Sequence, residues 1–193
     1  MDGNEDSQAF NRCGEPPVDL RLARRARHGD VAAFHALVDQ YASYLFALAV
    51  SLVGNAADAE DVVQETLAGA YRGLGAFEER SSVKTWLTRI LVRQAARHLE
   101  RSRRRGSHVV QSDGGLASAS GRASTSDADA RIDIAAAVGS LSPEHRDVIV
   151  LREFQGMSYD EIAQVLAIPR GTVESRLYRA RRRLQQLLRD YLA

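Results

Sequence analysis

Residues 158–184 read SYDEIAQVLAIPRGTVESRLYRARRRL, and this stretch decides the fold of the C-terminal half. Ser158 followed three residues later by Glu161 is typical of a capped helix start. A tight turn at residues 167–169 separates this short helix from a second one that begins at Arg170. Two helices joined by a short turn, the second rich in arginine, predict a DNA-binding helix-turn-helix.

The solvent-facing side of the second helix is polar and basic. Once its apolar face is set aside, the remaining residues are Arg170, Thr172, Ser175, Arg176, Arg179, Arg182 and Arg183. If the helix lies in the major groove, the N-terminal members reach base edges and the later arginines meet phosphates. The alternative is a solvated basic helix that closes a small bundle. The capped helix and tight turn before it favour the helix-turn-helix.

The rest of the C-terminal half also predicts helices. A short helix covers residues 130–139, and another begins at Ser142-Pro143, with serine as N-cap and proline at the first helical position. This second helix is predicted to end at Gly156. Its apolar spacing places four side chains inward: Val148, Ile149, Leu151 and Phe154.

The N-terminal half predicts a helical bundle. Asp30 caps a long amphipathic helix that Gly54-Asn55 ends. A short helix from Asp19 precedes it, a third starts near Ala56, and a fourth runs over about 83–101. No segment shows the sustained alternation of a strand.

The segment at 106–126 is rich in serine and glycine and cannot bury enough apolar area to fold alone. We therefore predict an all-α protein of two small helical domains joined by a flexible linker. Its parts are a tail at 1–18, a helical domain at 19–105, the linker at 106–129 and a helix-turn-helix domain at 130–193. With such a linker, we expect the domains to move independently or to pack loosely in the free protein.

Composition excludes several protein classes. The 193 residues are 45% hydrophobic and 26% charged, as in ordinary soluble globular proteins. The acidic N-terminus does not resemble a secretory signal, and no apolar run predicts membrane insertion. The single cysteine, Cys13, cannot form an internal disulfide, so we expect a cytoplasmic protein. Two basic blocks, at 80–105 and 170–193, each lie next to an acidic segment, and this pattern predicts two contact surfaces of opposite sign.

The chain resembles a known family across most of its length. The segments NAADAEDVVQETLAGAYRGLGAF at 55–77, VKTWLTRIL at 83–91 and GTVESRLYRARRRL at 171–184 occur in this order and spacing in extracytoplasmic-function sigma factors of the sigma-70 superfamily. The first two resemble sigma region 2 and the third resembles sigma region 4. The resemblance implies a transcription initiation factor that binds core RNA polymerase, recognises promoter DNA and helps to melt it.

The same resemblance implies a role for each surface. The resemblance assigns polymerase binding to Asp58, Asp61, Gln64 and Glu65. These residues are expected to share one polar side of a helix, opposite Val62. Recognition of double-stranded DNA at the −35 element falls on Arg170, Thr172, Glu174, Ser175, Arg176, Tyr178, Arg179 and Arg183. Recognition and melting of the −10 element fall on Phe77, Arg80, Ser81, Lys84, Trp86, Arg89, Arg93 and Arg97. An anti-sigma factor is a possible further partner.

Several assignments have alternatives. Acids at the start of a helix also favour its dipole, which accounts for Asp58 and Asp61 but poorly for Gln64 and Glu65. Trp86 fits a core role at least as well as base contact, because its spacing matches the buried face. Ala167 stands where the family usually has glycine. If the backbone there is left-handed, alanine costs up to about 1 kcal/mol.

Other function classes have less support. There is no phosphate-binding glycine loop, nucleophile elbow or HExxH motif, so we expect no enzymatic activity, cofactor or metal. The main alternative is a stand-alone helix-turn-helix regulator, which would need another sigma factor for transcription. A helical protein-binding module is a third class, and it predicts no DNA contact by Arg176 or Arg179.

Overall fold

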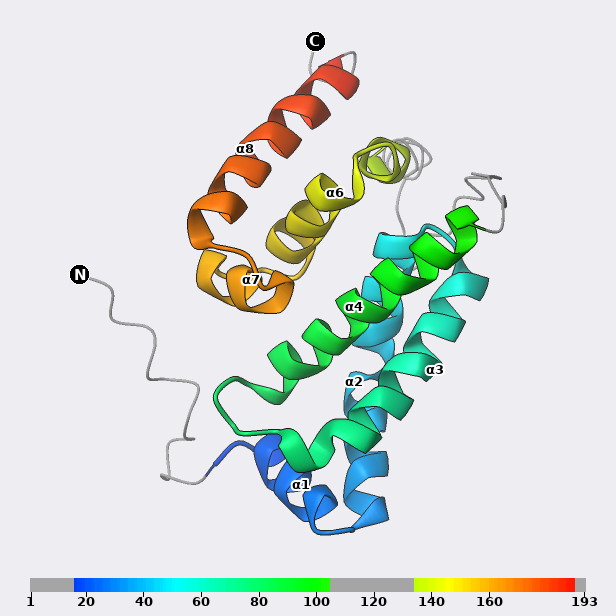
Figure 1. The fold of residues 1–193 in the computed structure, drawn as a ribbon, viewed down its shortest axis with the longest axis vertical. Helices are drawn as coiled ribbons and strands as arrows, with labels where there is room; N and C mark the ends of the chain where they lie inside the picture. The colour runs from blue at the N-terminus through cyan, green and yellow to red at the C-terminus, as the bar shows by residue number, and fades with distance from the viewer. Residues whose placement is uncertain (1–15, 105–133, 190–193) are drawn as a thin grey trace, which may run out of the picture.

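The structure, a computed structural model, describes residues 16–104 and 134–189, and all regular secondary structure in these two stretches is helical (Figure 1). The N-terminal part contains α1 (Val18–Arg27), α2 (Val31–Val53), α3 (Ala56–Gly73), the 3-10 turn η1 (Leu74–Ala76) and α4 (Val83–Arg104). The C-terminal part contains a helical segment at 134–139, α6 (Pro143–Ile149), the π-helical segment η2 (Val150–Phe154), α7 (Tyr159–Leu166) and α8 (Arg170–Leu187). The predicted all-α class is confirmed. The predicted linker at 106–129, Cys13 and the tail up to residue 15 lie outside the described residues.

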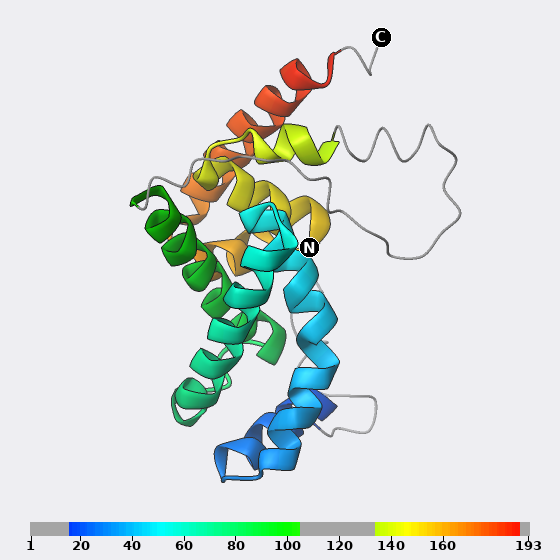
Figure 2. The same ribbon diagram turned by 90° about the vertical axis from the view of Figure 1, so that its right-hand side faces the viewer.

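Local sequence signals set the helix ends of the N-terminal bundle. The Asp30 side chain accepts a hydrogen bond of 3.0 Å from the Ala33 N–H at the start of α2, and Gly54 ends that helix with a φ of +91°. Asn55 caps α3 in the same way, through the Asp58 N–H at 2.8 Å. Helices α2, α3 and α4 pack on one another, and α1 lies across the end of the bundle beside η1 (Figures 1 and 2). The fully buried side chains between them include Leu45, Leu48, Val62 and Leu91.

Helix α2 is long and apolar enough to cross a membrane, judged by length and composition alone. Its apolar face packs on α3 and α4, where Leu45, Leu48 and Ala49 are fully buried. These contacts are those of the core helix of a bundle.

The C-terminal part differs from expectation at the end of its predicted 143–156 helix. Val148, Ile149 and Leu151 are buried as predicted, but Phe154 is 47% exposed. The expectation that Phe154 points inward is wrong, because the chain becomes π-helical at 150–154. The wider turn changes the angle between successive side chains, so the 3.6-residue period no longer predicts which face they occupy.

The helix-turn-helix forms as the sequence predicts. The Ser158 hydroxyl accepts from the Glu161 N–H while the Glu161 carboxylate accepts from the Ser158 N–H, which completes the capping box. Helix α7 then ends at Ala167, whose φ of +54° lies in the left-handed region. The condition under which alanine is costly at this position, a left-handed backbone, is therefore met.

Replacing Ala167 by glycine should stabilise the protein by up to about 1 kcal/mol, because glycine adopts the left-handed conformation without steric cost. The matched control is Ala163→Gly inside α7, which should destabilise by about 1 kcal/mol because glycine is a poor helix former. Urea unfolding of both variants measures the two shifts. Equal destabilisation by both would contradict the strain at Ala167.

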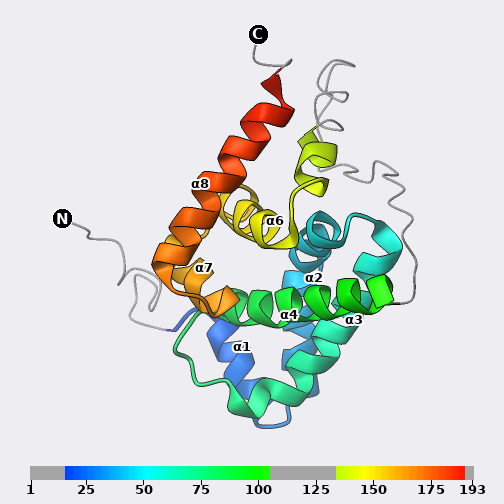
Figure 3. The same ribbon diagram turned by 45° about the horizontal axis from the view of Figure 1, so that its top comes forward.

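The two parts of the chain are in direct contact. Helix α7 lies against α4, while α6 and η2 lie against α2 (Figures 1 and 3). The Arg146 guanidinium donates to the Leu52 carbonyl at 2.9 Å and also contacts the carbonyls of Gly139 and Leu141. Buried apolar side chains from both parts form one continuous core. The expectation that the domains move independently or pack loosely in the free protein is wrong, because the composition of a linker does not reveal that the domains it joins have complementary faces.

Candidate nucleic-acid and polymerase interface

The outer face of α8 carries an exposed basic surface in its C-terminal half. Tyr178 is 62% exposed, and Arg182 lies over its ring at 5.9 Å. Arg179 and Arg183 are exposed beside it. Together these residues line a shallow open hollow with Ser175 and Gln186. A tyrosine ring among arginines on one helix face suits the sugar-phosphate backbone and base edges.

The N-terminal half of α8 is tied to its own domain by ion pairs. Arg170 donates to Glu174 at 3.1 Å and to Asp160 of α7 at 2.9 Å. The Ser175 hydroxyl donates to the Thr172 carbonyl at 3.0 Å. Glu174, a predicted DNA contact, is therefore held by Arg170 in the free protein. DNA contact by either residue requires this pair to be shared or exchanged.

Arg176 is directed toward α6. Its guanidinium lies 3.1 Å from the Glu144 carboxylate, and its side chain is only 25% exposed. Asp147, one turn further along α6, is partly buried. Burial raises the pKa of Asp147 to about 6, although the nearby Arg146 and Arg176 oppose this rise. The side chain of Arg176 thus links the recognition helix to α6.

The raised pKa of Asp147 predicts a pH-dependent stability. The folded-state pKa lies above the unfolded one, so the protonated carboxyl favours folding and this contribution is lost as pH rises through about 6. Between pH 5 and pH 8, Asp147→Asn should therefore gain about 1 kcal/mol of stability relative to the unmodified protein, because only about one pH unit lies between pH 5 and this pKa. Urea unfolding of both proteins at the two pH values isolates the contribution of this carboxyl from that of all groups that the two proteins share. Parallel stability curves would contradict it.

Helix α4 carries the second basic surface. Arg93 and Arg97 are exposed one turn apart, while Arg89 is partly covered and its Nε atom is buried. Lys84 lies over the ring of Tyr44, 4.5 Å from its centroid. The hydroxyls of Tyr44 and Thr88 share a hydrogen bond of 2.7 Å. Burial raises the pKa of Tyr44, and the charge of Glu161 on α7 adds to this rise. Lys84 therefore lies near the contact between the domains, not on the exposed row.

The loop between η1 and α4, residues 77–82, divides into inner and outer parts. Phe77 is buried and packs on Trp86, with ring centroids 5.0 Å apart. Trp86 is partly buried against the core, as its spacing favoured. Arg80 projects outward with a side chain that is 85% exposed, and Ser81 follows it. In the free protein, Arg80 and Ser81 are thus better placed than Phe77 to meet a partner.

The acidic face of α3 has paired and unpaired members. Asp58 lies 3.0 Å from His98, and Glu65 pairs with Arg101 at 2.9 Å, both across to α4. The hydrogen bond from Arg101 lowers the pKa of Glu65. Asp61 and Gln64 are exposed between them in the sequence, whereas the neighbouring Val62 is fully buried. The predicted polar stripe is therefore present, with Asp61 and Gln64 as its outward members.

The described part of the chain contains no cluster of side chains that could bind a metal ion. Within residues 16–104 and 134–189, no group of three or more histidine, cysteine, aspartate or glutamate side chains could hold an ion.

Both helical parts of the chain match known protein families. Residues 37–105 match the family described as Sigma-70 region 2, and residues 131–184 match Sigma-70, region 4. The chain belongs to the sigma-70 family. The region 2 match covers most of α2, α3 and α4, and the region 4 match covers the helix-turn-helix. A sigma factor directs transcription initiation by RNA polymerase and is not itself an enzyme.

Relatives place this sigma factor in the extracytoplasmic-function group. It is 39% identical to the RNA polymerase sigma-H factor of Pseudomonas aeruginosa over 186 residues, which cover 89% of this chain and 96% of the relative. It is 37% identical to the ECF RNA polymerase sigma-E factor of Escherichia coli K12 over 177 residues, covering 86% and 92%. The group inferred from the sequence motifs is confirmed.

Two solved structures share the fold of this sigma factor. CnrH in complex with the cytosolic domain of CnrY has a TM-score of 0.67 and 30% identity, covering 90% of this chain and 99% of that one. The sigma factor RpoE of Bartonella quintana, in complex with the anti-sigma factor NepR, has a TM-score of 0.64 and 34% identity, covering 82% and 98%.

Sequence reasoning missed two sets of contacts in this sigma factor. Arg24 and Arg27 of α1 reach the 77–82 loop, and Arg146 reaches α2. The signal for the first set was available, since two arginines three residues apart in a short helix share one face. No sequence signal identified Leu52 as the partner of Arg146. Arg146 bonds the backbone carbonyl of Leu52, and every residue type carries such a carbonyl.

Proposed function

We propose that this sigma factor divides promoter recognition between its two domains. The acidic face of α3 binds core RNA polymerase, the 77–82 loop and α4 read and melt the −10 element, and α8 reads the −35 element. The observation that carries the proposal is the presence of two exposed arginine rows, one on α4 and one on α8, in the two helical parts of the chain. A stand-alone regulator that binds DNA through a single surface would not need both arginine rows.

The exposure of each residue supports distinct roles at the −35 element. Arg179 and Arg183, which are exposed, contact phosphates or base edges. Arg176, held by Glu144, reads guanine only after that pair opens. Thr172, Ser175 and Tyr178 complete the surface, and the pair of Arg170 with Glu174 lies at its N-terminal end.

At the −10 element, the exposed residues divide between backbone and base. Arg93 and Arg97 follow the phosphates along α4, which adds sequence-independent affinity. Arg80 and Ser81 meet an unpaired base at the outer side of the loop. Phe77 and Trp86 support the loop from within. Lys84 and Arg89 join the DNA surface when the contact with the C-terminal domain is released.

The closed arrangement must therefore open during initiation. In the free protein α7 lies against α4, and the shared core joins the two DNA-reading domains. We infer that two promoter elements that are distant along the DNA are both reached only after these domains separate. Binding to polymerase supplies the free energy that separates the domains, because only the open form makes contacts with both DNA elements.

We further propose that an anti-sigma factor regulates this protein in the cytoplasm. The two similar solved structures are complexes, one with a cytosolic domain and one with an anti-sigma factor. A partner that binds the closed form better than the open form would favour the inactive state, since a ligand shifts an equilibrium by its differential affinity.

Run-off transcription with purified core RNA polymerase tests the proposed function. The template is a promoter library randomised at the −10 and −35 elements, and the readout is the sequence of the transcribed templates. We expect specific transcripts that require this protein and no other sigma factor. Transcription that still depends on a second sigma factor would support the stand-alone regulator instead.

A further inference from the structure

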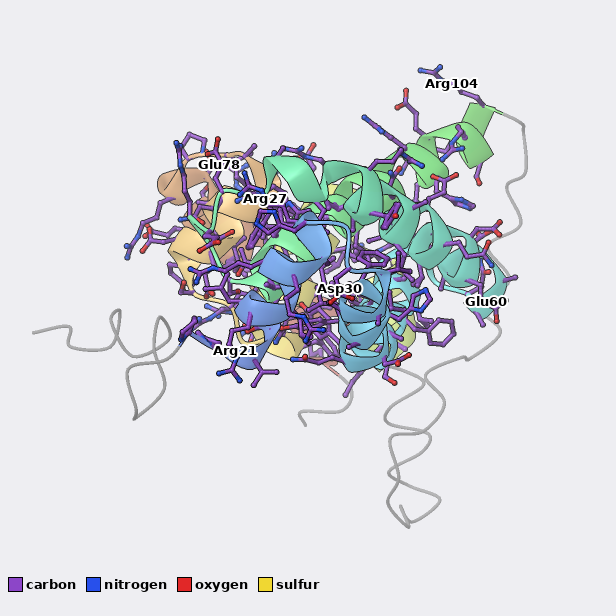
Figure 4. All side chains as sticks on the ribbon, turned by 90° about the horizontal axis from the view of Figure 1, so that it is seen from below. Arg21, Arg27, Asp30, Glu60, Glu78 and Arg104 are labelled. Atoms are coloured by element: carbon purple, nitrogen blue, oxygen red, sulfur yellow. The ribbon has the colours of Figure 1, made fainter. Side chains whose placement is uncertain are left out.

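Helix α1 fastens the 77–82 loop from outside. Arg24 donates to both carboxylate oxygens of Glu79, at 2.9 and 2.6 Å. One turn further on, Arg27 reaches the Phe77 carbonyl oxygen at 3.4 Å. Figure 4 labels Arg27 on α1 and Glu78 of the same loop in this view from below. Two arginines on one helix face therefore hold two points of the loop.

Helix α1 is itself fixed to the bundle, so it can act as a support. Its Ala23 and Ala26 are buried. The Tyr41 hydroxyl of α2 donates to the Asp19 carboxylate at 2.8 Å. Burial of the Tyr41 ring and its bond to Asp19 raise the pKa of that hydroxyl, so it remains a donor at neutral pH.

The backbone of the loop needs such a support. Glu79 has a φ of +58°, a left-handed conformation that side chains other than glycine rarely adopt. A residue persists there when its surroundings determine its conformation, and the two-oxygen contact with Arg24 does this. At the end of the loop, the Ser82 hydroxyl accepts from the Thr85 N–H at 3.0 Å. The chain is thus fixed on both sides of Arg80, which is exposed, and of Ser81, which is partly exposed.

We infer that Arg24 and Arg27 are positioning residues that hold the 77–82 loop ready for the −10 element. The inference rests on the proposed role of this loop in reading −10 DNA. A loop held in its binding conformation loses less entropy when an unpaired base docks, so preorganisation raises affinity and base discrimination. Neither arginine needs to touch DNA for this effect.

The test compares Arg24→Ala with Arg25→Ala. Arg25 is the matched control, because it is also an exposed α1 arginine but pairs with Asp30, away from the loop. Two readouts are measured: amide hydrogen exchange in residues 78–81, and run-off transcription by core polymerase on templates randomised at −10. We expect Arg24→Ala to raise exchange and to reduce discrimination among −10 bases by about two- to five-fold, the scale of a lost exposed ion pair. Arg25→Ala should change neither, and the swap Arg24→Glu with Glu79→Arg should restore both in part.

The outcomes separate this inference from the proposed function. If Arg24→Ala behaves like Arg25→Ala in both readouts, the inference is overturned. If Arg80→Ala or Ser81→Ala changes −10 preference while Arg24→Ala does not, the loop reads DNA as proposed but α1 does not position it. If no loop variant changes −10 preference, the proposed role of the loop fails and the inference fails with it.

Discussion

Asp61→Lys is expected to weaken binding of this sigma factor to core RNA polymerase by at least about ten-fold, because it places a cation in the centre of an acidic interface. Asp61 is the exposed aspartate of the α3 stripe, and its neighbour Val62 is fully buried. Reversal of Glu65 as well should abolish binding, but it also breaks the Glu65–Arg101 pair within the bundle. The single variant is therefore the cleaner one. Fluorescence anisotropy of labelled protein titrated with core enzyme measures the affinity.

Asp39→Lys provides the matched control for this prediction. Asp39 is also an exposed aspartate, but it lies on α2, so the charge change is identical while the surface differs. Circular dichroism should show unchanged helical content in both variants. Equal weakening by Asp39→Lys would show that net charge, not the stripe, governs polymerase binding. Retained binding by Asp61→Lys would remove α3 from the interface.

Arg179→Ala is expected to reduce binding to −35 DNA by about ten-fold at moderate salt, within the range for loss of a recognition-helix arginine. Arg179 is exposed beside Tyr178 on the outer face of α8. A phosphate contact predicts equal weakening on all sequences and a salt dependence reduced by about one unit of slope. A base contact predicts instead that specificity relaxes at one position of the element.

Arg181→Ala tests whether position on α8 matters. Arg181 lies two residues away, and its guanidinium pairs with Glu153 at 2.7 Å. We expect little change in DNA affinity for this variant, although the contact between η2 and α8 weakens. The readout for both variants is DNA binding measured over a range of salt concentrations. If Arg181→Ala weakens binding as much as Arg179→Ala, general positive charge, not the outer face, drives recognition.

Most of the fold could be predicted because it depends on local signals. Asp30, Gly54 and the Ser158–Glu161 capping box act within a few residues, and each ends or begins a helix as expected. The failure at Phe154 is also local in origin. A π-helical segment changes the angular step between side chains, and no residue type in 150–154 marks such a segment in advance.

The candidate site was harder to predict because it depends on contacts between distant segments. The spacing of Arg176 places it on the solvent side of an isolated helix, yet Glu144 on α6 draws it inward. Lys84 likewise has a basic side chain suited to DNA, but Tyr44 of α2 holds it near the contact between the domains. Periodicity locates a face of one helix, whereas the partner of that face is set by packing.

The central claim is that one chain serves two promoter elements by opening from a closed free state. Distance measurement between spin labels tests it most directly, with labels at Glu60→Cys on α3 and Gln185→Cys on α8 in a Cys13→Ser background. We expect one short distance in the free protein, fixed by the contacts of α7 with α4 and of Arg146 with Leu52. In the complex with core polymerase and promoter DNA, the distance should lengthen by tens of ångströms. An unchanged distance in that complex would contradict the account.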